Sequence, residues 1–239
     1  MTFDGKEFFR IFSAKLSSNY PGTSIGVEYI VMRAWLENIS KGTELTCKEY
    51  IEQELKKFPP DADYSEYSHV YDIAEEDIPR IVNSAALVSI VALFENGISR
   101  LLYFCSKQER VNYKLRQRAS LVDKYQDFLI STLKIGYKFD DGFINLAKDI
   151  VDIRNVCAHG SALIFTFSSI EKTAFEMTLE RNIFEIVSRS SGQLSFTGGQ
   201  LIISTSYLQS CFEIFDQQTK SLRDYIEAHY FKKVSKDVM

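Results

Sequence analysis

The residues best suited to chemistry lie in one short stretch, VDIRNVCAHG, from Val151 to Gly160. This stretch holds Arg154, Asn155 and His159 within six positions, in a chain with only three histidines. A fixed guanidinium can stabilise negative charge that develops on a phosphate, and an imidazole titrates near neutral pH and can transfer protons. Together they suit phosphoryl transfer without a metal ion.

The helix predicted from Phe143 to His159 places Arg154 in an unusual position. On a helical wheel Arg154 falls on the apolar side, about 140° from His159, whereas Asn155 and His159 share a polar stripe. A charge on an apolar face costs several kcal/mol unless it is paired or reaches a cavity. We therefore expect either a break in the helix between Arg154 and His159, or a charged partner for Arg154, for which Glu95 is the candidate.

Ordinary helix-end chemistry is an alternative explanation of the same residues. An arginine near the C-terminus of a helix interacts favourably with the helix dipole, and His159 before Gly160 could cap the last carbonyl groups. On spacing alone, both explanations stay open.

Three further helices are predicted around this one. The first runs from about Pro79 to Ser106, the second over residues 113–134, and an amphipathic helix closes the chain over residues 207–231. The first is long enough to span a membrane, but the polar residues within it favour a buried helix of a soluble protein. Between the third and fourth helices, residues 162–206 are β-prone, with segments 165–169, 175–179, 184–187, 193–196 and 200–204, and Gly198-Gly199 predicts a two-residue hairpin turn.

The chain before Pro79 divides into two predicted parts. Residues 1–58 form a helical extension of three short helices, over residues 8–16, 25–39 and 48–58, with Thr46 as the N-cap of the last. Residues 59–77 are strongly acidic and predict a solvated linker or an acidic lid. The sequence thus predicts a mainly α protein with a helical domain at 78–239, a small β-hairpin or sheet before its last helix, and extra N-terminal helices.

The pattern R-N-x-x-x-H followed by glycine resembles the R-x4-6-H motif of the HEPN superfamily, whose name stands for higher eukaryotes and prokaryotes nucleotide-binding. Here the motif is RNVCAH at 154–159, and Asn155 takes the place of the polar residue that often follows the arginine there. The resemblance extends from about Pro79 to Phe231 and includes the order of the four helices. It implies an all-α bundle that forms a homodimer, with the two motifs facing each other across a cleft.

Many members of this superfamily are metal-independent endoribonucleases, so the resemblance implies an RNA substrate. By position, Arg154 would stabilise the scissile phosphate, His159 would act as general acid and base, and Asn155 would orient the pair. Glu95 could supply an acidic residue that assists from the first helix in some relatives. The products would be a 2′,3′-cyclic phosphate and a 5′-hydroxyl, in a toxin-antitoxin, stress or phage-defence setting with an antitoxin or regulatory protein as a further partner.

One departure from the family pattern qualifies the resemblance. Certain HEPN toxins carry a modifiable tyrosine two positions after the histidine, where this chain has Ser161. There are two alternatives to a nuclease. One is a catalytically silent HEPN-like module that binds RNA or a nucleotide, and the other is a helical scaffold in which the motif is coincidental.

A basic cluster between the first two long helices is a further candidate for contact with RNA phosphates: Lys107, Arg110, Lys114, Arg116 and Arg118.

The bulk properties of the chain set wider limits. With 239 residues and a net charge of −4, it is long enough for a sizeable core and carries no uniformly basic coat. Its four cysteines show no metal-ligand or disulfide spacing, which favours reduced, mostly buried thiols and no metal or other cofactor. The N-terminal sequence does not resemble a signal peptide, so we expect a cytoplasmic protein with no membrane partner.

Overall fold

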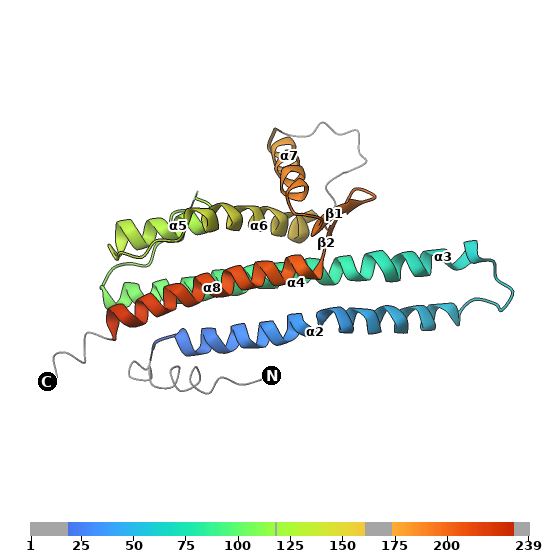
Figure 1. Ribbon diagram of the computed structural model, residues 1–239, viewed down its shortest axis with the longest axis horizontal. Helices are drawn as coiled ribbons and strands as arrows, with labels where there is room; N and C mark the ends of the chain where they lie inside the picture. The colour runs from blue at the N-terminus through green and yellow to red at the C-terminus, as the bar shows by residue number, and fades with distance from the viewer. Residues whose placement is uncertain (1–18, 118, 161–173, 232–239) are drawn as a thin grey trace. The chain divides into compact units, whose positions relative to one another are not determined.

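The computed structural model describes residues 19–117, 119–160 and 174–231, and only the backbone of residues 159–160 and 174–179 (Figure 1). In this part of the chain the protein is mainly helical, with one small antiparallel sheet directly before the last helix, as the sequence predicts. The elements, in order, are α2 Gly22–Leu55, α3 Tyr64–Asp72, η1 Ile73–Asp77, α4 Ile78–Gln108, α5 Leu121–Asp127, η2 Phe128–Thr132, α6 Asp141–Gly160, α7 Ala174–Ser188, β1 Leu194–Thr197, β2 Gln200–Ile203 and α8 Thr205–Tyr230.

The N-terminal helices predicted at 25–39 and 48–58 are one helix, α2, and the break between them was wrongly predicted. No proline interrupts this region, and the hydroxyls of Thr43 and Thr46 donate to the carbonyls of Ile39 and Gly42, at 2.8 and 2.9 Å. Thr46 therefore lies inside a helix and is not an N-cap. The helix predicted at 8–16 lies outside the described residues.

The acidic segment expected as a linker is helical from Tyr64 onward. Asp63 and Glu66 form a capping box at the start of α3, in which the Asp63 backbone N–H donates to the Glu66 carboxylate at 3.2 Å. A π-helical stretch, η1, then leads directly into α4. Asp77 is therefore not the N-cap predicted for that helix; its carboxylate accepts a hydrogen bond from Arg80 at 2.7 Å.

The long helix predicted over residues 113–134 is much shorter. Residues 113–117 have no helical structure, and Ser120 caps α5 by accepting a hydrogen bond from the backbone N–H of Asp123 at 3.3 Å. A second π-helical stretch, η2, follows α5. The other three long helices, α4, α6 and α8, lie close to their predicted bounds.

In the described part of the β-prone region, the predicted hairpin is present and two other β-prone segments are helical. Segments 175–179 and 184–187 belong to helix α7, where Ile183 and Ile186 are buried at the three-residue spacing of one helix face. The hairpin at Gly198-Gly199 is confirmed: both glycines have positive φ, and Thr197 pairs with Gln200 across the turn between β1 and β2. The strand predicted at 165–169 lies outside the described residues.

The chain forms two compact units, each assembled from separate segments. The first unit contains residues 1–32, 91–148 and 212–239, and the second contains residues 33–90 and 149–211. The unit boundaries therefore fall inside α2, α4, α6 and α8, the long helices of Figure 1. The sequence predicts domain boundaries at residues 58 and 77, which would separate parts that fold independently. These boundaries stay a prediction.

One helical stretch, from Tyr64 to Gln108, includes a segment that could cross a membrane by length and composition alone. Within the protein, 44% of that segment is buried. The predicted cytoplasmic location stays a prediction.

Candidate functional site

The motif residues lie on the last two turns of α6, which continues without interruption to Gly160. The helix is therefore not broken between Arg154 and His159, and that alternative was wrong. Five residues of regular helix separate the two positions by about 140° around the axis and by about 7.5 Å along it. One copy of α6 thus directs these two positions toward different sides. The side chain of His159 lies outside the described part of the structure.

The core-facing side of α6 explains the position of Arg154. Ala147, Ile150 and Ile153 are completely buried, whereas Arg154 and Asn155 are both half-buried. The helical wheel placed Arg154 among the apolar residues, but Arg154, unlike its neighbour Ile153, is only half-buried. Its side chain is long enough to keep the charged end near solvent, so the burial of Arg154 costs less than the wheel implies.

Two aspartates on the same helix precede the motif. Asp149 accepts a hydrogen bond from Arg189 at 2.7 Å, and Asp152 lies almost one turn further along. Burial raises the pKa of both carboxyl groups; the charge of Asp149 adds to the effect at Asp152, and Arg189 opposes it at Asp149. The sequence placed Asp152 on the polar stripe but gave no indication that burial would favour its protonated form.

A buried group of thiol and phenol side chains lies in the second unit with the motif. Cys157, Tyr207 and Cys211 are all less than a tenth exposed. Burial raises the pKa of the Cys211 thiol to about 12, with Tyr207 opposing, and also raises the pKa of Cys157. Protonated, enclosed thiols are poor nucleophiles. All four cysteines are free and three are buried, as predicted.

The other predicted site residues lie in the first unit. Glu95 is half-buried on α4, and its proposed pairing with Arg154 stays a prediction because the two residues belong to different units. The basic residues Lys107, Arg110, Lys114 and Arg116 are exposed, and Arg118 lies outside the described residues. The structure therefore brings at least part of the basic cluster to the surface, as contact with phosphates would require.

Sequence reasoning missed a cavity at the C-terminal end of α4, whose walls include Arg100, Tyr103 and Lys107.

Over residues 19–117, 119–160 and 174–231, no group of three or more His, Cys, Asp or Glu side chains is arranged to hold a metal ion. No family model, no curated protein and no solved structure matches the chain. Hypotheses about function consequently depend on the residues themselves.

Proposed function

We propose that this protein is a metal-independent endoribonuclease of the HEPN type, acting as a homodimer. The observation that carries the proposal is the placement of Arg154 and Asn155 on the final turns of an unbroken helix, both half-buried and within five residues of His159. This placement gives the R-N-x-x-x-H motif a rigid support in a mainly α protein. The family assignment itself depends on the motif and the order of the helices.

The proposed reaction is an internal transesterification of RNA. The ribose 2′-oxygen attacks the adjacent phosphorus while the bond from phosphorus to the 5′-oxygen breaks, which leaves a 2′,3′-cyclic phosphate and a 5′-hydroxyl. His159 accepts the proton of the 2′-hydroxyl, and a protonated histidine donates a proton to the departing 5′-oxygen. Arg154 stabilises the charge on the phosphoryl oxygens, and Asn155 orients the reacting groups.

The helix geometry favours a site shared by two copies. Because Arg154 and His159 face different sides of one α6, a single copy does not direct both toward one small target. A two-fold axis would bring the arginine of one copy and the histidine of the other into one cleft. The motif histidine of the second copy would then be the acid that protonates the 5′-oxygen.

The direct test is cleavage of a labelled single-stranded RNA by the full-length protein in excess EDTA. We expect fragments that end in a cyclic phosphate, and no cleavage at a linkage whose 2′-hydroxyl is replaced by hydrogen. Arg154→Ala and His159→Ala should each lower the rate by roughly 100-fold or more. Arg181→Ala, on an exposed arginine of α7, and His69→Ala are the matched controls and should cleave normally.

Cleavage that persists in both motif variants would contradict the proposal, as would cleavage abolished by EDTA. A second outcome would favour the binding module instead: RNA that binds in an Arg154-dependent way but stays intact. The half-buried position of Arg154 is compatible with such a role. A setting in toxin-antitoxin or phage defence predicts that expression slows growth and that His159→Ala relieves the effect.

A further inference from the structure

A cavity of about 640 Å³ in the first unit carries two kinds of chemistry in its walls. Tyr103, Phe104 and Tyr113 supply aromatic surface, and Arg100 and Lys107 supply positive charge. The volume is within the range of small-ligand sites in proteins. The cavity belongs to a different unit from the motif, so its interpretation does not depend on the proposed nuclease.

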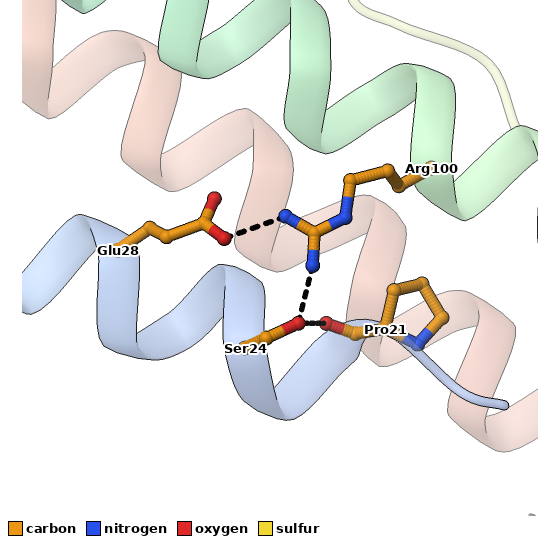
Figure 2. A network of polar contacts seen from close by, with 4 residues as sticks. All are labelled: Pro21, Ser24, Glu28 and Arg100. Carbon is orange, nitrogen blue, oxygen red and sulfur yellow. Dashed lines mark hydrogen bonds and ion pairs between the residues drawn. The ribbon is translucent and has the colours of Figure 1, made fainter. Parts of the chain in front are cut away.

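Arg100 lines the cavity, and Figure 2 shows the polar contacts that hold its side chain. Its Nη1 donates to the Glu28 carboxylate at 2.6 Å, and its Nη2 donates to the hydroxyl of Ser24. The Ser24 hydroxyl in turn donates to the carbonyl of Pro21 at 2.9 Å, and Pro21 also lines the cavity. The result is a planar guanidinium with a fixed orientation, which suits stacking or a directed hydrogen bond to a ligand.

The aromatic wall combines an exposed ring with a buried polar atom. Tyr103 is 49% exposed, and Tyr113 meets it edge to face with 5.8 Å between the ring centroids. The Tyr113 hydroxyl is enclosed and lies near Ser99, whose hydroxyl is 3.1 Å from that of Tyr125. The ring of Tyr103 is therefore the aromatic surface open to a ligand, and Tyr113 supports it edge to face.

Lys107 adds a mobile positive charge next to the exposed ring. Its Nζ lies 4.9 Å from the centroid of the Tyr103 ring, a cation–π distance, and the residue is exposed. The chain continues past Lys107 with the exposed cations Arg110, Lys114 and Arg116. The cavity therefore offers a flat aromatic surface for stacking together with an anion-binding side chain.

We infer that this cavity binds a nucleotide unit, that is, a planar base joined to a phosphate. The base stacks against the exposed ring of Tyr103, with Tyr113 perpendicular to that ring, and the phosphate is bound by Lys107 with Arg100 beside it. A simple anion would make no use of the aromatic wall, and an uncharged aromatic compound would make no use of Lys107. The same chemistry is present in a free mononucleotide and in a single strand of RNA, where the cations beyond Lys107 would contact the next phosphates.

Calorimetric titration of the full-length protein at about 50 mM salt tests this inference with four probes. The probes are AMP, adenosine, inorganic phosphate and a short oligoadenylate with a non-cleavable 2′-O-methyl backbone. We expect AMP to bind more tightly than either adenosine or phosphate, because only AMP engages both walls. Binding of the oligonucleotide without AMP would assign the site to a strand, and binding of AMP with no gain for the oligonucleotide would assign it to a free nucleotide.

Two exposed residues allow variants that should leave folding intact. Tyr103→Ala should weaken binding roughly fivefold or more through lost stacking, and Lys107→Glu should weaken binding of AMP but not of adenosine. Tyr64→Ala, on a tyrosine 62% exposed, and Lys138→Glu are the matched controls. Arg154→Ala should bind AMP normally, because Arg154 is not in the cavity, so a failed nuclease proposal would not affect the AMP result. The inference is overturned if no probe binds, if phosphate binds as well as AMP, or if both cavity variants bind like the controls.

Discussion

The two compact units differ in what fills their cores. In the first unit, phenylalanine rings interlock: Phe94 and Phe215 stack with 4.3 Å between centroids, and Phe143 meets both edge to face. In the described part of the second unit no phenylalanine is buried, and the core is formed by aliphatic side chains with Cys157, Cys211 and Tyr207. The first core therefore depends on contacts between aromatic rings, and the described part of the second depends on aliphatic packing.

The two units also differ in the direction in which the pKa values of their carboxyl groups are shifted. In the first unit, the pKa of Asp123 is lowered by the Ser120 hydroxyl and by Lys148, which lies 3.2 Å away. In the second unit, burial raises the pKa of Asp149 and of Asp152. The first unit thus stabilises its charges, whereas the second keeps groups next to the motif that favour a proton. Along α6, Lys148 therefore contributes a cation to an ion pair, whereas Asp149 and Asp152 favour protonation.

The largest effect should come from the ring cluster. Phe215→Ala removes a completely buried ring from between Phe94 and Phe143, and it should lower the free energy of unfolding by about 3–5 kcal/mol. The control is Phe184→Ala in the second unit, because that ring is 42% exposed and should cost much less. Urea unfolding followed by circular dichroism measures both. Equal losses would remove the distinction between the two cores.

A buried hydrogen bond of the first unit should have an intermediate effect. The hydroxyls of Tyr29 and Thr219 lie 2.7 Å apart, and both residues are almost fully buried. Tyr29→Phe should cost about 1–2 kcal/mol because it leaves the Thr219 hydroxyl without a partner. Adding Thr219→Val should recover part of this loss. A double variant that loses the full sum of the single losses would show that the two hydroxyls are not coupled.

The opposite pKa shifts predict opposite dependences on pH. A lowered pKa stabilises the folded protein above the unfolded-state pKa, so Asp123→Asn should destabilise near pH 7 and lose its effect as the pH falls. A raised pKa stabilises below the unfolded-state pKa and the contribution is lost as pH rises, so Asp152→Asn should be relatively more stable near pH 7. Unfolding midpoints at about pH 3 and about pH 7 distinguish the two. The same sign for both variants would contradict the comparison.

The smallest effect is expected at the surface of the second unit. Arg189 is 59% exposed and pairs with Asp149, so Arg189→Ala should change the free energy of unfolding by less than about 1 kcal/mol. Its clearer consequence is a further rise in the pKa of Asp149, because an opposing positive charge is removed. Titration of the Asp149 carboxyl carbon by NMR would detect this rise, and an unchanged pKa would show that the ion pair is not populated in solution.

The elements predicted correctly are those with a strong local pattern. The periodicity of α4, α6 and α8 and the Gly198-Gly199 turn are properties of a few neighbouring residues. The failures occurred where local preference conflicts with context. Aromatic and β-branched residues in 184–187 favour a strand but lie in α7, where buried isoleucines fix the helix face. The continuity of α2 could be inferred only from the absence of a helix-breaking residue such as proline. This absence is a weaker sign of a continuous helix than Thr46, a typical N-cap residue, is of a new helix start.

The candidate site shows the same limit. The position of the motif on α6 was predictable, because helix period and motif spacing are both local. The half-buried state of Arg154 could not be predicted from the sequence, because it depends on how many residues around α6 become buried when the helix packs against its neighbours. The cavity next to Arg100 was also not predictable, since Pro21, Arg100 and Tyr113 come from three distant segments. Only the four-residue spacing of Tyr103 and Lys107 could have indicated it.

The π-helical stretches η1 and η2 have a consequence for how the chain could have evolved. A π turn holds one residue more than the α-helical turn it replaces, so a single insertion produces it and a single deletion restores the regular helix. Between Ile73 and Asp77, loss of one residue would rotate everything upstream by about 100° relative to α4. A variant of this protein with one residue deleted at either place should therefore have a regular α-helix there, with the segments on its two sides rotated relative to each other.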